Sequence, residues 1–162
     1  MSHNEEQYMF TSNGLQDTEA LAAWLAEATV PGTVIGLDGD LGAGKTAFSQ
    51  LFAKHLGVKG IVNSPTFTII KEYEGRLPFY HMDVYRLSIE EADELGLDEY
   101  FYGEGVCLVE WSQIISELLP ESHLHVYLET TGLEQRKITV RGSGEPYEEW
   151  CCNLKKNGVF KS

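Results

Sequence analysis

The residues whose types and spacing suit chemistry most clearly are Gly39, Gly44, Lys45 and Thr46, which fit the pattern G-x-x-x-x-G-K-[ST]. Glycines let the backbone fold so that successive N–H groups point at phosphate oxygens. The lysine of this pattern reaches the β and γ phosphates, and the following hydroxyl ligates Mg²⁺. The pattern predicts a site for a nucleoside triphosphate and Mg²⁺, formed by Gly39, Asp40, Leu41, Gly42, Ala43, Gly44, Lys45 and Thr46.

The segments on either side of this loop have the character that the pattern requires. Residues 33–39, TVIGLDG, form an apolar run with β-branched residues, which predicts a buried strand. Residues 46–56 place apolar side chains on one helical face, so a helix should follow, with its positive dipole end at the phosphates. The chain has no N/T-K-x-D guanine signature, which favours ATP.

Two acids close apolar strand-like runs and are candidates for the metal side of the site. Glu110 ends VCLVE and Asp83 ends FYHMD. An acid at the end of a neighbouring strand holds Mg²⁺ in enzymes with this loop, usually through water. We predict Glu110 and Thr46 on the metal side and Asp83 beside them, positioning water or tuning the metal. Either carboxylate alone is also compatible with a solvated strand end.

For other candidate site residues, a purely structural role explains the residue type as well as a functional role does, or better. Trp111 follows Glu110 and is compatible with core packing, and His81 is more compatible with a structural histidine. Thr66 and Thr68 lie in NSPTFT, where such enzymes often place a switch segment, but a turn entering a strand also explains them.

Composition limits the classes of partner. The chain has 162 residues, 25 acidic against 12 Lys and Arg, and a formal net charge of −13. Broad binding of a nucleic-acid backbone needs clustered cations, so we expect no DNA binding and only indirect contact with RNA. Solubility alone also explains the charge.

The chain has three cysteines whose spacing indicates no disulfide framework, which is typical of a protein in a reducing compartment. No signal-like start and no apolar run near the ~18 residues of a membrane span are present, so we expect a cytoplasmic protein without membrane contact.

The remaining pattern predicts an α/β fold, a P-loop NTPase-like mixed β-sheet with helices on its faces, in a single domain over residues 1–162. Strands are expected at residues 7–11, 33–39, 66–75, 77–85, 105–111, 123–129 and 136–142. Helices are expected at residues 17–28, 46–56, 88–95, 112–119 and 146–157, the last of them polar.

Five blocks in order, GDLGAGKT, NSPTFTIIKEY, YHMDVYRL, LGLDEYF and CLVEW, resemble the TsaE family. This family is the bacterial ATPase component of tRNA threonylcarbamoyladenosine biosynthesis. The similarity runs from about residue 15 to about residue 141, and residues 142–162 stay unassigned.

The resemblance implies a cytoplasmic ATPase that acts with two partners, TsaB and TsaD, to modify adenosine 37 of tRNAs that read ANN codons. It implies that the protein resets or regulates that assembly, with weak turnover alone, and that tRNA is held by the partners. It places the family's metal-side acid at Glu110, its essential aspartate at Asp83, its tryptophan at Trp111 and an arginine near the nucleotide at Arg136.

Two alternatives stay open at this point. A small-molecule kinase shares the loop, but the segment 88–104, where a lid would stand, has seven acids and no Lys or Arg. A nucleotide switch that does not hydrolyse ATP differs from a slow ATPase mainly in turnover, which sequence does not give.

Overall fold

The computed structural model describes residues 5–40, 44–60, 62 and 69–159. Its seven strands are Glu5–Ser12 (β1), Thr33–Gly39 (β2), Ile70–Glu74 (β3), Pro78–Asp83 (β4), Val106–Glu110 (β5), His123–Thr130 (β6) and Arg136–Ser143 (β7). Its helices are Leu15–Ala28 (α1), Lys45–His55 (α2), Ile89–Glu94 (α3), Asp98–Phe101 (α4), Tyr147–Asn157 (α5) and the 3₁₀ segment Ser112–Leu118 (η1).

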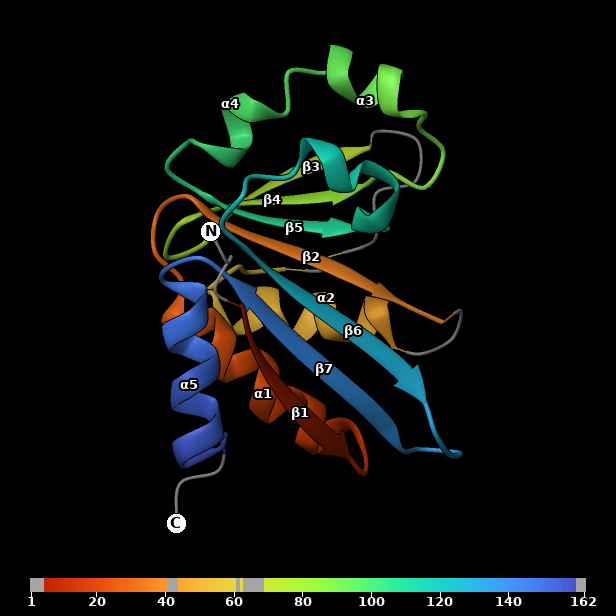
Figure 1. Cartoon of the computed structure of the whole chain (residues 1–162), viewed down its shortest axis with the longest axis vertical. Helices are drawn as coiled ribbons and strands as arrows, with labels where there is room; N and C mark the ends of the chain where they lie inside the picture. The colour runs from red at the N-terminus through yellow and green to blue at the C-terminus, as the bar shows by residue number, and fades with distance from the viewer. Residues whose placement is uncertain (1–4, 41–43, 61, 63–68, 160–162) are drawn as a thin grey trace.

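The strands form one mixed sheet in the order β1-β7-β6-β2-β5-β4-β3. The four central strands, β6, β2, β5 and β4, are parallel, and β1, β7 and β3 pair antiparallel at the two sides. Parallel strands all end at the same edge of a sheet, so β2, β5 and β4 bring the loop after Gly39, Glu110 and Asp83 to one edge (Figure 1). The predicted fold class is confirmed.

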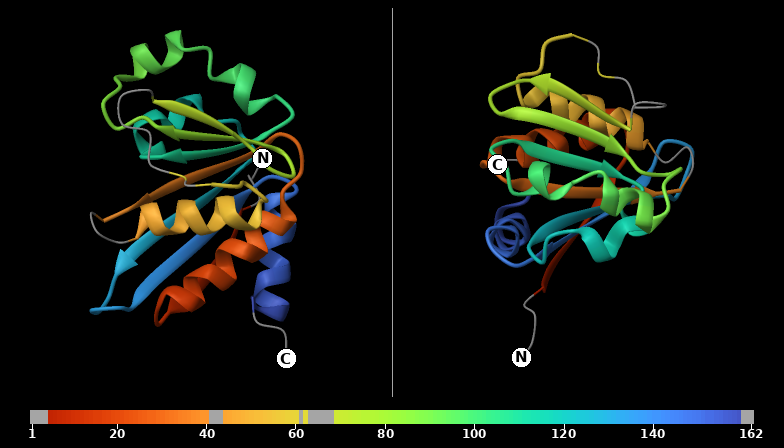
Figure 2. Two further views of the ribbon diagram at one scale, coloured as in Figure 1. Left: turned by 180° about the vertical axis from the view of Figure 1, so that it is seen from behind. Right: turned by 90° about the horizontal axis from the view of Figure 1, so that it is seen from above.

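The sheet separates two apolar cores. The larger core joins one face of β2, β5 and β6 to α1, α2 and α5, and the smaller core lies on the other face, under α3, α4 and η1. Figure 2 shows α1 and α2 on one side of the sheet and α3 and η1 on the other. Cys107 lies in the smaller core, and burial raises the pKa of its thiol to about 12.

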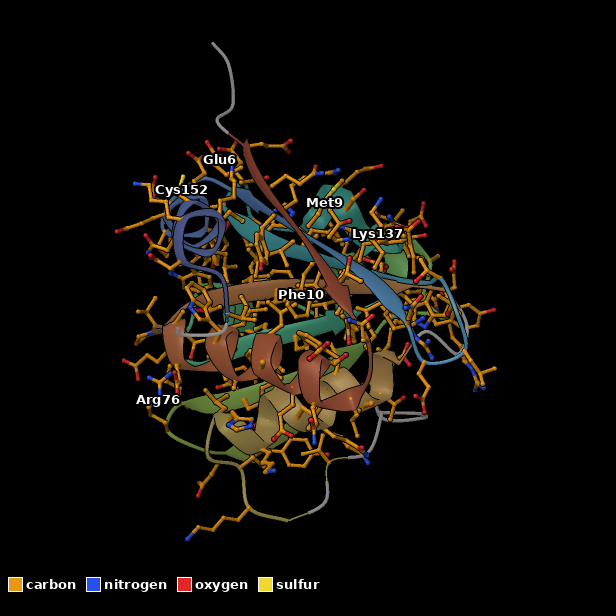
Figure 3. The ribbon with its side chains drawn as sticks, turned by 90° about the horizontal axis from the view of Figure 1, so that it is seen from below. Glu6, Met9, Phe10, Arg76, Lys137 and Cys152 are labelled. Atoms are coloured by element: carbon orange, nitrogen blue, oxygen red, sulfur yellow. The ribbon has the colours of Figure 1, made fainter. Side chains whose placement is uncertain are left out.

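Side-chain alternation explains the outer sheet strands. On β1, Phe10 is buried against the larger core, whereas its neighbour Met9 is 56% exposed on the opposite face (Figure 3). A separate question is whether a helix spans a membrane. Among the described helices, none is long and apolar enough to cross a bilayer.

The predicted elements differ from the observed ones in four places. Residues 112–118 form a 3₁₀ segment and no α-helix, and Trp111 adopts a left-handed conformation directly before it. The short helix α4 was not predicted. Ile69 has φ 63° and is not in a strand, so β3 begins at Ile70; residues 66–68 lie outside the described part.

The C-terminal helix is the fourth difference, since it is not simply polar. It buries Tyr147, Trp150, Cys151 and Leu154 in the larger core. The hydroxyl of Tyr147 accepts a hydrogen bond from the backbone N–H of Val34 at 2.9 Å. The segment left unassigned by sequence therefore completes the core behind β1 and β7.

Candidate nucleotide site

The described part of the phosphate loop is shaped by contact with strand β6. Gly39 has φ 155°, and a Cβ there would clash with the carbonyl oxygen of Leu128 and lie 3.2 Å from its carbonyl carbon. The Asp40 N–H then donates to the same carbonyl at 3.3 Å. Gly44, with φ 98°, stands at the N-cap of α2. Leu41, Gly42 and Ala43 lie outside the described residues, so their predicted phosphate contacts remain predictions.

Lys45 is buried at the start of α2, which is unusual for a lysine whose hydrogen bonds to the described residues go to carbonyl oxygens. Its Nζ donates to the carbonyl oxygen of Gly39 at 2.8 Å and of Asp40 at 3.3 Å, and lies 4.4 Å from the centre of the Trp111 ring. The ammonium group is therefore held against the loop by carbonyl dipoles and an aromatic face. Thr46, the next residue, is exposed.

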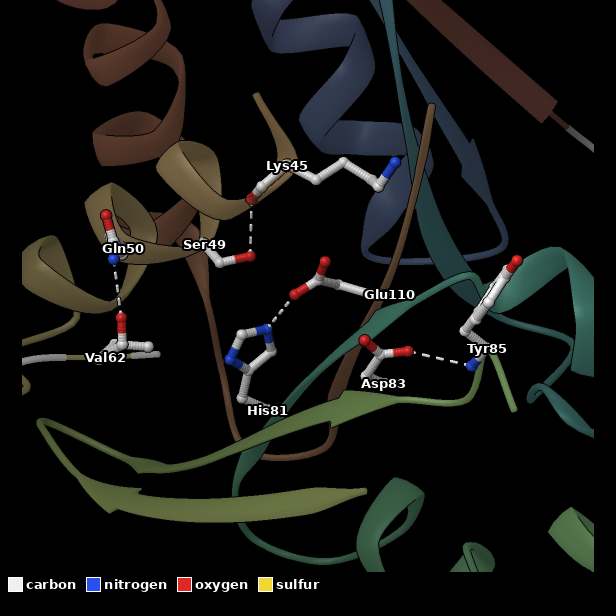
Figure 4. A network of polar contacts seen from close by, with 8 residues as sticks. All are labelled: Lys45, Ser49, Gln50, Val62, His81, Asp83, Tyr85 and Glu110. Carbon is white, nitrogen blue, oxygen red and sulfur yellow. Dashed lines mark hydrogen bonds and ion pairs between the residues drawn. The ribbon is translucent and has the colours of Figure 1, made fainter. Parts of the chain in front are cut away.

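Glu110 comes from the strand next to the loop. It pairs in register with Leu37 of β2 on one side and with Asp83 of β4 on the other. Its side chain lies on the α2 face of the sheet, 4% exposed, and its Oε2 is 2.6 Å from Nε2 of His81 (Figure 4). Glu110 therefore ends the strand next to β2, and Asp83 ends the strand after it.

His81 is completely buried, and within the described part of the chain only one of its ring nitrogens has a partner. Nε2 faces Glu110, whereas Nδ1 has no hydrogen-bond partner among the described residues. The ring also stacks on Phe79 at a centroid distance of 5.9 Å. The interpretation of His81 as a structural histidine is therefore incomplete, because its one polar contact orients a candidate metal-side carboxylate.

Asp83 is half-buried at the end of β4. Desolvation raises its pKa, with a smaller contribution from the charge of Glu110, while the N–H of Tyr85, donating to Oδ1 at 3.0 Å, opposes the rise. Ionisation of the Asp83 carboxyl group therefore lowers the free energy of unfolding. This is the environment in which a carboxylate gains from a bound cation.

The desolvation of the Asp83 carboxylate predicts how Asp83→Asn changes thermal stability relative to the parent. A raised folded-state pKa means that ionisation costs stability above that pKa and nothing below the unfolded-state value. Asparagine keeps an acceptor for the Tyr85 N–H and carries no charge, so the variant should unfold at a higher temperature than the parent near neutral pH. The gain should shrink as the pH is lowered from neutral toward the ordinary pKa of an aspartate, about 3.9, because the parent carboxyl becomes protonated. Thermal unfolding across that range measures it; a lower midpoint for the variant throughout would contradict this account of Asp83.

Four other predicted residues have different outcomes. Trp111 does not continue strand β5, and its ring packs against the smaller core and beside Tyr85, 4.7 Å between ring centres. The Arg136 guanidinium donates to the carbonyl oxygens of Gln135 at 2.9 Å and Gly132 at 3.3 Å in the β6–β7 hairpin, so its nucleotide contact stays a prediction. Thr66 and Thr68 lie outside the described residues.

The candidate donors fit Mg²⁺ by their chemistry. Hydroxyl and carboxylate oxygens from Thr46, Glu110 and Asp83 are hard ligands of the kind that Mg²⁺ takes, usually one or two per site with the rest from phosphates and water. The described residues contain no group of three or more His, Cys, Asp or Glu arranged to hold a metal. A metal held partly by a substrate's phosphates needs no such group.

Sequence reasoning missed a second polar group next to the loop. Asp38 is 2% exposed and faces the side of the sheet opposite Glu110, where Ser112 and His125 contact it. A charged residue inside the run TVIGLDG was the available signal, because a buried acid requires partners.

The fold and the loop define the class of protein. A Gly-rich turn between a buried parallel strand and a helix, with an acid at the end of the adjacent strand, is the arrangement of P-loop proteins. A computed superposition supports this: the crystal structure of Bacillus subtilis YdiB matches with a TM-score of 0.83 and 46% identity, covering 96% of this chain and 98% of that one.

Sequence comparison identifies the family within that class. The family model described as "Threonylcarbamoyl adenosine biosynthesis protein TsaE" matches residues 12–138. The Bacillus subtilis (strain 168) protein named "tRNA threonylcarbamoyladenosine biosynthesis protein TsaE" is 52% identical over 143 residues, 88% of this chain and 90% of that protein. A protein of the same name from Treponema pallidum (strain Nichols) is 41% identical over 130 residues, 80% of this chain and 96% of its own. The chain belongs to the TsaE family.

Proposed function

We propose that this chain is the ATP-binding and ATP-hydrolysing component of bacterial tRNA threonylcarbamoyladenosine biosynthesis. It acts in the cytoplasm with TsaB and TsaD and meets tRNA only through them. Membership of a family named for this biosynthesis supports the pathway. The observation that carries the ATPase part is the pairing of Leu37 with Glu110, which sets an acid on the strand beside the phosphate loop.

The chain's own residues divide the work of binding. Backbone N–H groups at the start of α2 and the Lys45 ammonium face the phosphates, and Lys45 exchanges the carbonyls of Gly39 and Asp40 for phosphate oxygens. The net acidity of the chain does not oppose this, because the site relies on backbone dipoles and one buried lysine. Thr46 and Glu110 would hold Mg²⁺, which, when bound, neutralises charge on the β and γ phosphates.

Turnover requires that a water molecule be oriented toward the γ-phosphorus. Asp83 stands next to Glu110 at the sheet edge, and its carboxylate is oriented by the Tyr85 N–H. We assign Asp83 to this water and Glu110 to the metal side, with His81 fixing the Glu110 carboxylate. Arg136 is bonded to hairpin carbonyls, so charge stabilisation in the transition state is assigned to the partner complex, which makes turnover weak alone.

Calorimetric titration of the purified chain tests the binding part of the proposal. ATP should bind more tightly with Mg²⁺ than with excess EDTA, and Thr46→Ala should remove most of that difference. GTP should bind more weakly than ATP. Equal affinity for ATP with and without Mg²⁺, or no binding at all, would contradict the proposal.

A further inference from the structure

The start of η1 is tied to strand β2 by a buried carboxylate that the nucleotide site does not use. Asp38 accepts hydrogen bonds from Oγ of Ser112, from the N–H of Gln113 at 3.3 Å and from Nε2 of His125 at 2.8 Å. These three donors come from η1 and β6, far apart in sequence. Because a buried carboxylate without donors is costly, the three contacts fix one geometry for this junction.

The sheet leaves room for this junction at one position. A Cβ on Gly36 would lie 2.9 Å from Cβ of Ser112 and 3.4 Å from Cδ2 of His125. Ser112 can therefore reach Asp38 only because residue 36 has no side chain. The two small residues allow η1 to lie directly on β2.

The same junction sets an unfavourable backbone conformation at Trp111. Its φ of 63° and ψ of 35° are left-handed, which costs a bulky residue free energy that its surroundings must supply. On one side of Trp111, its N–H donates to the carbonyl oxygen of Leu37 at 3.1 Å. On the other side, Ser112 and Gln113 are held by Asp38. Hydrogen bonds to β2 therefore hold the chain at Trp111 and directly after it.

This conformation decides where the indole ring lies. With the chain turned at Trp111, the ring packs beside Lys45 Nζ and Tyr85. The ring also packs against the smaller core, on the face of the sheet opposite Glu110. The Asp38 side chain contacts Ser112, Gln113 and His125, so it reaches Trp111 through the two residues that follow it.

We propose that Asp38 is a positioning residue for the nucleotide site, holding Trp111 against the lysine of the phosphate loop. In this role it touches neither nucleotide nor metal. Asp38 fixes the position of the Trp111 ring. That ring and the carbonyls of Gly39 and Asp40 hold the Lys45 ammonium group at the loop before ATP binds. The effect on nucleotide rests on the proposed function, whereas the placement of the ring does not.

The first test is the fluorescence of Trp111 without nucleotide, obtained as the difference between each protein and its Trp111→Phe counterpart. Asp38→Ala should change the emission of Trp111 in intensity and wavelength, and Ser112→Ala, a milder change, should shift it in the same direction. Asp38→Asn should stay near the parent, because Ser112 and His125 can each accept from the amide. Ser12→Ala is the matched control, since it removes another buried hydroxyl contact, to Thr18 at 2.7 Å, in a different place.

The second test is a double-mutant cycle on ATP affinity. Asp38→Ala should weaken ATP binding about fivefold or more in the parent and not at all in the Trp111→Ala background, because the two residues act through one contact. Unchanged Trp111 emission in both Asp38→Ala and Ser112→Ala, or an equal loss of affinity in both backgrounds, would overturn the proposal. If the parent does not bind ATP, the proposed function fails, and the emission test still decides the role of Asp38.

Discussion

Lys45→Ala should weaken the binding of ATP by about 10- to 100-fold, because a charge-assisted hydrogen bond contributes about 1.5–3 kcal/mol and each 1.4 kcal/mol is tenfold in affinity. Lys45 is the charged side chain of the described loop that contacts the carbonyls of both Gly39 and Asp40. Its loss removes the group that would move onto the phosphates and leaves the backbone dipoles in place. Calorimetric titration with ATP measures the loss.

The matched control for Lys45 is on the same helix. Lys54 is in the last turn of α2, is 66% exposed and pairs with Glu19 at 3.1 Å. Lys54→Ala removes the same charge from the chain but not from the loop, so it should leave ATP affinity within about twofold, since exposed ion pairs contribute little. Similar losses in both variants would mean that Lys45 acts only through net charge, which would contradict its assignment.

Glu110→Gln should lower turnover of ATP by about 100-fold or more, because the lost charge is one that would hold Mg²⁺ at the transferring phosphoryl group. The amide keeps the shape and an oxygen that accepts from His81, so the variant removes charge from the metal side without emptying the buried position. ATP affinity should change less than turnover, because the backbone N–H groups and Lys45 carry most of the binding. Parallel measurements of phosphate release and ATP affinity check this.

Glu117→Gln serves as the control for this second variant. Glu117 is exposed on η1, seven residues further along the chain, and the described structure assigns it no part in the site. Its replacement should leave both turnover and affinity unchanged. Parental turnover in Glu110→Gln, or an affinity loss as large as its turnover loss, would move the metal-side role away from Glu110.

Local signals predicted the parts of the fold that depend on neighbouring residues. The run TVIGLDG forms β2 at the predicted residues 33–39. The helix expected over residues 88–95 is observed as α3, and Ser88 and Glu91 form the capping box at its start. The phosphate loop was recognised because its glycines, lysine and threonine lie within eight residues of one another. The choice of Glu110 for the metal side and of Asp83 as its neighbour came from the character of their strands and from the family resemblance, whereas the order of the strands came only from the structure.

Long-range contacts could not be predicted in this way. Asp38 meets His125 across 87 positions and Ser112 across 74, and nothing in the local sequence pairs them. The left-handed turn at Trp111 was also missed, because alternation along VCLVEW predicts one more strand residue. Its cause is the junction with β2, which exists only when β2, β5 and β6 lie side by side.

The most direct test of the central claim is phosphate release from ATP with Mg²⁺, measured for the purified chain alone and then with its cognate TsaB and TsaD, without any small-molecule acceptor. The account predicts slow release alone, a clear rise with the partners, and loss of that rise in Glu110→Gln. Absence of release in both settings, with ATP still bound, would contradict the ATPase and leave a nucleotide switch or a kinase awaiting its acceptor.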